Sequence, residues 1–287
     1  SVGVHECASG NSYWSGNFLN WLAMSRLDIL RWTFYGGTRM TDTPTQTILE
    51  RAEIPSDLHA WAKVYSGPDI ANLAPFTGTQ TFCNVSMGTT GQWTTPTTTT
   101  SGVGSVPVIR VASGGWADWA STAKFQCQSR NQTVDTSGNS ARPNTTINNY
   151  MARVQVCQNV SGIPNESFCV TDGAALKPEG LLQKYSKGDS NEKRFGLVTG
   201  SAVHARGAGQ LRRNIGMLAG NVSGTSCATG TGAGDGDEFN SNDGTFCYKD
   251  AGTAPTEGIV YTLDHLQITG WVYETSGTDS GSYDYGS

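Results

Sequence analysis

The seven cysteines constrain this chain more than any other feature of its sequence. They are Cys7, Cys83, Cys127, Cys157, Cys169, Cys227 and Cys247. Their wide separation lacks the Cys-x-x-Cys or His-x-x-x-His spacing of a zinc site. Disulfide bonds are therefore the better interpretation, and structural disulfides belong to oxidising, exported locations.

Two cysteine pairs enclose short loops and are predicted to be bonded. Cys157 and Cys169 bracket a segment rich in Gly, Pro and Asn, and Cys227 and Cys247 bracket a Gly-rich segment. Closing loops of this size stabilises a folded chain by about 3 kcal/mol each. Local pairing at both places is therefore the expected framework.

The remaining cysteines are paired by elimination. Cys83 is predicted to bond Cys127, which leaves Cys7 as the odd cysteine. An odd cysteine in an exported chain indicates a partner outside the stretch shown, or in another subunit.

Composition argues against two functional classes. The formal net charge is -5 and only 15% of the residues are charged, so uncharged polar residues must supply most of the surface. Nucleic-acid binding needs clustered Lys and Arg, and the nearest approach here is the pair Arg212 and Arg213. No apolar run reaches the roughly 18 residues of a membrane-spanning helix. The sequence thus predicts neither a nucleic-acid partner nor a membrane span.

Hydrophobic periodicity predicts an α/β chain in three parts. Residues 1–65 are expected to be helical, residues 66–146 are a Thr/Gly/Ser-rich loop or β insertion, and residues 147–287 alternate strand and helix. That alternation predicts parallel strands joined by a right-handed crossover. Helices are expected at 16–35, 55–65, 177–187 and 256–268, and strands at 105–113, 149–157 and 193–203, the last largely buried.

The first helix, over residues 16–35, is predicted to be amphipathic. Phe18, Leu19, Leu22 and Leu30 recur at three- and four-residue spacing and are expected to face the core. Gly36 and Gly37 end the helix.

Several blocks of sequence occur in a recognisable order. WSGNFLNWL at residues 14–22 is followed by MSRLD at 24–28. VQVC at 154–157, PEGLLQKY at 178–185 and RFGLVTGS at 194–201 come later. Together they resemble the amino-terminal region of the type IV pilus tip adhesins of the PilC/PilY family. The Thr-rich middle of the chain carries no such block.

That resemblance implies a partial von Willebrand A-like (Rossmann-type) domain with insertions, at the pilus tip or outer-membrane surface. It implies adhesion, surface sensing and support of pilus assembly, and no catalysis. The partners it implies are minor pilins or other tip components and a host or abiotic surface. The family's metal-binding motif DxSxS has its nearest counterpart at residues 135–139, where Asn139 replaces the second Ser. In the family this motif precedes the SGNFLNW block, so the stretch shown is expected to begin after it.

One acidic loop offers oxygen ligands for a cation. They are Asp235, Asp237, Asn240, Asn242 and Asp243. Ca²⁺ binds six to eight such oxygens, although the spacing is not that of an EF-hand. The loop is therefore either a Ca²⁺ site, the only cofactor site the sequence offers, or a solvated acidic turn.

Two functional hypotheses remain. The first is a binding module, an adhesin segment that acts through its surface. The second is a structural subunit of an extracellular filament or surface layer, in which self-association uses edge strands and Cys7. A hydrolase is disfavoured because His204 precedes Ser226, in the string GTSCA, by only 22 positions and lacks the sequence context of a protease histidine.

Overall fold

The computed structural model shows a mixed α/β chain in two compact units. It describes residues 13–54, 59–87, 106–121, 126–130, 139–159, 165–172, 175–186, 193–200, 209–218, 238–240, 243–249 and 258–266. Unit 1 comprises the described residues of 13–24 and 51–152, and unit 2 those of 25–50 and 153–266. The predicted α/β class is confirmed.

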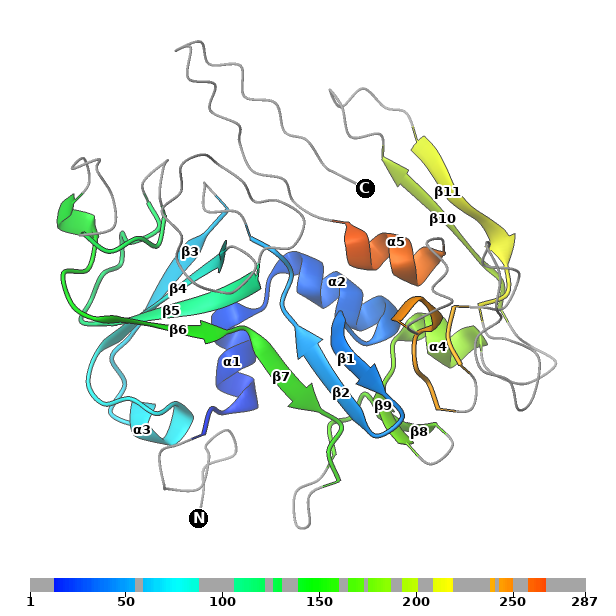
Figure 1. Cartoon of the computed structure of the whole chain (residues 1–287), viewed down its shortest axis with the longest axis horizontal. Coiled ribbons are helices and arrows are strands. Elements are labelled where there is room, and N and C mark those ends of the chain that lie inside the picture. The colour runs from blue at the N-terminus through cyan, green and yellow to red at the C-terminus, as the bar shows by residue number, and fades with distance from the viewer. Residues whose placement is uncertain are drawn as a thin grey trace, which may run out of the picture. The chain divides into compact units, whose positions relative to one another are not determined.

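Unit 1 is built on a four-stranded antiparallel sheet (Figure 1). Its strands in spatial order are β3 (Trp61–Tyr65), β4 (Gln80–Met87), β5 (Val106–Ser113) and β6 (Ile147–Met151). The helices α1 (Gly16–Ala23) and α3 (Ile70–Leu73) and the 3₁₀ turn η1 (Asn139–Ala141) complete the unit. Because β5 is buried at every position except its last, it must be covered on both faces.

Two apolar layers supply that cover. One contains Phe18, Leu22, Ile70, Leu73, Phe82, Ile109 and Val111. The other contains Ile54, Val85, Val106, Val108, Trp119 and the bonded pair Cys83–Cys127. This disulfide was predicted from the sequence by elimination. Both faces of the sheet in unit 1 are thus covered by side chains of the same unit.

The expected single helix over residues 16–35 is two helices. α1 ends at Ala23, and α2 (Arg26–Tyr35) begins after a capping box at Ser25. There the Asp28 amide donates to Ser25 Oγ at 3.2 Å and the Ser25 amide donates to Asp28 Oδ2 at 2.7 Å. Phe18 and Leu22 are buried as predicted, whereas Leu30, in α2, is 37% exposed. The apolar spacing continues from α1 into α2, so it does not reveal the boundary between them. The Ser-x-x-Asp pattern at residues 25–28 does indicate that boundary.

The predicted helix over residues 55–65 is wrong at its described end. Residues 61–65 form β3, which pairs antiparallel with β4 from Trp61↔Asn84 to Tyr65↔Gln80. Trp, Val and Tyr favour a strand, and tertiary pairing overrides the helical spacing of these residues. β4 and β5, which lie within residues 66–146, are the two central strands of the sheet in unit 1.

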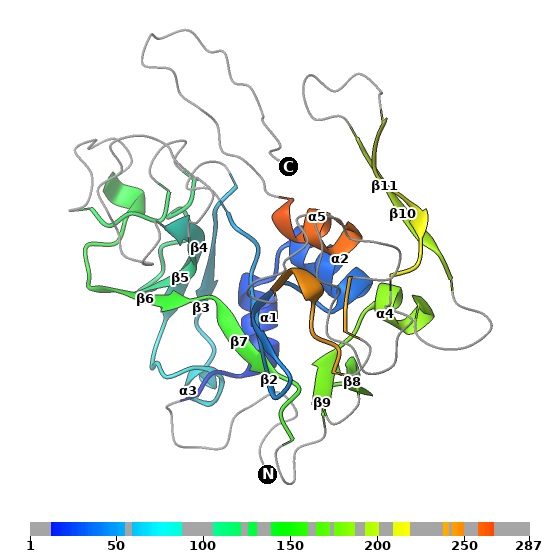
Figure 2. The ribbon, with the colours of Figure 1, turned by 45° about the vertical axis from the view of Figure 1, so that its right-hand side comes forward.

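The described residues of unit 2 form three small antiparallel sheets and three α-helices (Figure 2). The first sheet has the order β1 (Arg39–Thr43), β2 (Gln46–Glu50), β7 (Arg153–Val156). The other two are β8 (Cys169–Asp172) with β9 (Ala175–Pro178), and β10 (Phe195–Gly200) with β11 (Gly209–Gly216). The helices are α2, α4 (Leu181–Ser186) and α5 (Ile259–His265), with the 3₁₀ turn η2 (Cys247–Lys249).

Side chains of α2 hold the end of α5. The Arg31 guanidinium donates to the carbonyl oxygens of Leu263, Asp264 and Leu266, which satisfies carbonyls that a helix end leaves open. The Tyr35 and Tyr248 hydroxyls both donate to the Asp264 carboxylate. Burial, together with Asp264, raises the pKa of both phenols well above the ordinary value, so both remain donors. α2 and α5 are thereby fixed side by side.

The predicted parallel pairing is wrong for the described residues, because every strand pair there is antiparallel. The expected strand 149–157 is in fact β6 and β7, which belong to different sheets. The von Willebrand A-like arrangement requires a parallel sheet, and the described strands do not form one. Local alternation of strands and helices does not fix which strands become neighbours.

Unit boundaries fall after residues 24, 50 and 152. The domain boundaries expected from the sequence, after residues 65 and 146, remain a prediction. Among the described helices, none is long and apolar enough to span a bilayer.

Candidate functional site

The predicted cation loop lies only partly within the described residues. Asp235, Asp237 and Asn242 fall outside them, so the Ca²⁺ site remains a prediction. Asn240 and Asp243 are described, and they sit in a tight turn beside the Phe239↔Phe246 bridge. There Asp243 Oδ1 accepts hydrogen bonds from the Thr245 amide at 2.9 Å and the Thr245 hydroxyl at 2.7 Å. One oxygen of that carboxylate is therefore engaged in shaping the turn.

Glu238, the acidic residue at the start of the same segment, is buried, and both of its carboxylate oxygens accept hydrogen bonds. Its two oxygens accept from the amides of Ile259 and Val260, both at 2.7 Å, at the first turn of α5. Burial raises the pKa of the Glu238 carboxyl, and the two amides and Arg213, whose Nε lies 3.7 Å away, oppose that rise. Glu238 thus caps a helix from a distant segment.

A buried ionic cluster links β1 to β9 and so joins two sheets of unit 2. Asp42 Oδ2 lies 3.0 Å from Arg39 Nη1, Asp42 Oδ1 lies 2.7 Å from Lys177 Nζ, and these side chains are essentially inaccessible. The Phe246 amide donates to Asp42 at 2.7 Å, and the Arg39 guanidinium lies 3.7 Å from the centre of the Phe246 ring. Burial lowers the pKa of Lys177 although Asp42 opposes the shift. Because both ion pairs are shielded from solvent, we assign this cluster a structural role.

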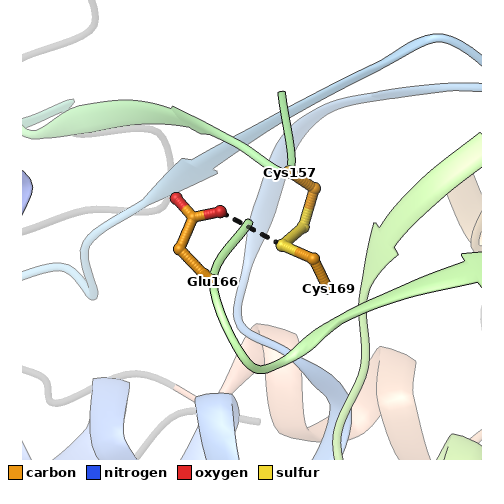
Figure 3. Close-up of side chains that lie close together, drawn as sticks. All are labelled: Cys157, Glu166 and Cys169. Atoms are coloured by element: carbon orange, nitrogen blue, oxygen red, sulfur yellow. Dashed lines mark hydrogen bonds between the residues drawn. A yellow bond between two sulfur atoms is a disulfide. The ribbon is translucent and has the colours of Figure 1, made fainter. Parts of the chain in front are cut away.

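The predicted disulfide Cys157–Cys169 is present in unit 2. Figure 3 shows it beside Glu166, whose Oε2 lies 3.3 Å from Cys169 Sγ. These three side chains could ligate a metal only as thiolates and carboxylate. With the sulfurs bonded to each other they are not a metal site. Cys247 is also disulfide-bonded, and its predicted partner Cys227 lies outside the described residues.

A groove beside this disulfide is the best candidate for a binding site. It has a volume of about 580 Å³ and lies between α2, α4 and the segment around β8. Its lining is Trp32, Thr33, Ser167, Phe168, Val170, Glu179, Gly180, Leu181, Gln183 and Lys184. This lining contains neither His nor Cys, the side chains that most often supply a base or a thiolate nucleophile.

The floor of the groove is apolar and open to solvent. Trp32 is 38% exposed, Val170 43% and Leu181 41%. The Phe168 ring meets the Trp32 ring edge to face, with their centres 5.8 Å apart. Glu179 and Lys184 add one charge of each sign to the lining. Such a surface binds apolar groups and aromatic or aliphatic side chains of a partner.

Close backbone contact gives the groove a rigid base. A Cβ on Gly180 would lie 2.3 Å from the Phe34 carbonyl carbon, so only glycine lets α4 begin against the end of α2. Gly36 ends α2 with a φ of 83°, a conformation that favours glycine. The Gln183 amide nitrogen donates to the Tyr35 carbonyl at 2.8 Å. The two helices that flank the groove are therefore locked together.

Sequence reasoning missed this groove, although one signal was available. The segment RLDILRWTFY of α2 carries apolar side chains on all sides. A surface helix with one buried stripe normally carries polar residues on its opposite face, whereas α2 leaves Ile29, Trp32 and Phe34 exposed. The other wall comes from residues 167–184, far away in sequence, which no local pattern places beside Trp32.

Two family models match the chain. Residues 1–112 match the description "PilY1 homolog, small alpha/beta domain", and residues 195–286 match "PilY1 homolog, second domain". The chain belongs to the PilY1 homolog family. The first match includes Trp32 of the groove, and the second begins at the first residue of β10.

Two relatives from Xylella fastidiosa support the same assignment. Both are named type IV pilus biogenesis factor PilY1 homolog; one is 32% identical over 91% of this chain and the other 30% identical over 64%. The chain spans 17% and 13% of their lengths, respectively. No solved structure matches the chain.

Proposed function

We propose that this chain is an extracellular, non-enzymatic segment of a type IV pilus tip adhesin, which supports pilus assembly and surface adhesion. The observation that carries the proposal is the 32% identity, over 91% of the chain, to a protein named for type IV pilus biogenesis. Disulfides support an exported location, because cytosolic thiols are kept reduced.

The groove between α2 and α4 supports the adhesive part of the proposal. Its exposed Trp32, Val170 and Leu181 form an apolar floor on a base that close packing makes rigid. A rigid surface loses little conformational entropy when a partner binds. In this proposal the groove receives an apolar group of a minor pilin, of another tip component, or of the surface to which the cell attaches.

Electron microscopy of the bacterium that makes the full-length protein tests the location. Antibodies raised against this chain and labelled with gold should mark solitary positions at pilus ends. Deleting the gene should reduce the number of pili per cell, and restoring it should return that number to normal. Label spread over the cytoplasm, or normal piliation and adhesion after deletion, would refute the proposal.

The alternative is a structural subunit of an extracellular filament or surface layer. The observation that favours it is the exposed aliphatic face of β10–β11, where Val198, Leu211 and Ile215 are at least 60% exposed. The same micrographs decide between the two, because a structural subunit would be labelled at regular intervals along a filament or over an array.

A further inference from the structure

The β10–β11 hairpin has one apolar face that the described residues leave uncovered. Val198 is 65% exposed, Leu211 60% and Ile215 74%, the most exposed aliphatic side chains of the described residues. Scattered exposed aliphatic residues are ordinary on a protein surface, but three on one small sheet form a patch. This patch does not include any residue of the groove.

Strand pairing explains why these side chains share a face. Along β10, Phe195 and Leu197 are half-buried and pack on the core of unit 2, whereas Val198 points the opposite way. Val198 pairs with Leu211 across the ladder. The Ile215 side chain lies over Gly196, with its Cγ1 atom 3.0 Å from the position that a Cβ on Gly196 would occupy. In the same way Val198 Cγ1 lies 3.1 Å from the position of a Cβ on Gly209. The result is a smooth aliphatic surface.

Both edges of the hairpin are open among the described residues. β10 and β11 pair only with each other there, and Figures 1 and 2 show no other labelled strand beside them. An open edge presents unpaired N–H and C=O groups, to which another strand can bond. A two-stranded sheet is only marginally stable alone and gains from a third strand.

The charged side chains of the described hairpin residues are all positive. Its described residues, 193–200 and 209–218, include Lys193, Arg194, Arg212 and Arg213 and no Asp or Glu. Arg213 lies near Glu238 and Arg212 donates to Thr199 Oγ1, whereas Lys193 and Arg194 are exposed where the chain enters β10. The chain as a whole has a net charge of -5. A partner that complements this surface is therefore acidic as well as apolar.

We propose that the β10–β11 hairpin binds an extended segment of another protein, in which aliphatic and acidic residues alternate, as an added β-strand. Main-chain hydrogen bonds to the open edge supply affinity. The aliphatic side chains of the segment continue the Val198–Leu211–Ile215 face, and its carboxylates lie toward Lys193 and Arg194. An anionic lipid surface would match the charges and the apolar face, but it cannot bond to the strand edge.

Peptide binding tests this proposal directly. The probe is a fluorescent peptide of alternating Val and Glu with the eight-residue length of β11, and fluorescence anisotropy measures its affinity for the chain. Ile215→Thr should weaken binding about tenfold, because a cross-strand aliphatic contact is lost. Lys193→Glu with Arg194→Glu should weaken it further and create binding to a Val-Lys peptide. Val64→Thr, which changes an exposed valine of β3, should leave the affinity unchanged.

A second peptide isolates the backbone contribution. The Val-Glu peptide with all of its backbone amides N-methylated keeps its charges and side chains but has no N–H group left to donate to a strand edge. We expect it to bind at least tenfold more weakly.

Equal affinity of the methylated and unmethylated peptides would overturn the proposal. The proposal would also be overturned if the Val-Glu peptide did not bind while vesicles of phosphatidylcholine and phosphatidylglycerol bound in a way that depends on the hairpin. That result would identify a lipid surface as the partner. Concentration-dependent dimerisation that Ile215→Thr abolishes, with no peptide binding, would identify a second copy of the chain as the occupant instead.

Discussion

Strands β5 and β10 show how differently the two units use their sheets. β5 in unit 1 is buried along nearly all its length, between two apolar layers and beside the Cys83–Cys127 bond. β10 in unit 2 alternates half-buried and exposed residues, and its outer face holds Val198. β5 therefore buries its apolar side chains in the core of unit 1, whereas β10 leaves Val198 at the surface of unit 2.

The two units also differ in the interactions that stabilise each of them internally. Unit 1 relies on apolar packing around β4 and β5. Unit 2 joins the sheets of β1 and β9 through the buried cluster of Asp42, Arg39 and Lys177, and it joins α4 to α2 through the contact of Gly180 with Phe34. In the functions proposed above, unit 2 carries the binding surfaces and unit 1 serves as the scaffold.

The largest expected effect is in the ionic cluster of unit 2. Asp42→Ala leaves the Arg39 and Lys177 charges buried without their carboxylate, which should lower the free energy of unfolding by about 3–5 kcal/mol. Glu50→Ala, which breaks the partly exposed Glu50–Arg153 pair, is the control and should cost less than about 1 kcal/mol. Denaturant titrations measure both. Equal losses would mean that the cluster does not hold unit 2.

A matched pair of isoleucines tests the contrast between the sheets. Ile109→Ala in β5 removes a 2% exposed side chain and should cost about 2–5 kcal/mol. Ile215→Ala in β11 removes a side chain that is 74% exposed and should change the free energy of unfolding by less than about 0.5 kcal/mol. If Ile215→Ala destabilised the chain as much as Ile109→Ala, the outer face of the hairpin would be part of a core.

A pair of glycines tests the rigid base of the groove. Gly180→Ala forces a Cβ against the Phe34 backbone and should cost about 1–3 kcal/mol. Gly200→Ala meets no atom within 4 Å and should be nearly neutral. Thermal unfolding of the two variants gives the comparison, and identical midpoints would show that α4 need not touch α2.

The smallest expected effect concerns the pH dependence of Glu238. Burial raises its pKa in the folded chain, so its contribution to stability is fully present below the unfolded pKa and is lost as pH rises through the folded pKa. The stability of the natural chain relative to Glu238→Gln should therefore fall as pH rises above the ordinary carboxyl range. A difference that rose with pH would mean that the amides of Ile259 and Val260 outweigh burial.

Local signals in the sequence predicted local structure well. The residues around β5 predicted a strand, Leu181 and its neighbours predicted α4, and loop-bracketing cysteines predicted Cys157–Cys169. Each depends on residues close together in the chain or on a covalent bond with few alternatives. Family blocks identified the relationship for the same reason, because they are contiguous strings.

Non-local structure was predicted poorly. The Trp32 and Phe168 rings are in contact in the lining of the groove, and Asp42 and Lys177 form an ion pair, although each pair is more than 100 residues apart in the chain. Periodicity cannot show which strands become neighbours, so the antiparallel sheets and the open hairpin became visible only in the structure. The helix at 61–65 was wrong because pairing with β4 outweighed local spacing.

Adhesion of living cells tests most directly whether unit 2 carries the binding surface. Leu181→Glu puts a charge on the floor of the groove, and Val64→Glu puts the same charge on a comparably exposed aliphatic position of unit 1. In the full-length protein we predict normal numbers of pili for both variants, strongly reduced attachment per pilus for Leu181→Glu, and normal attachment for Val64→Glu. Unchanged attachment for Leu181→Glu, or an equal loss for both variants, would contradict this assignment.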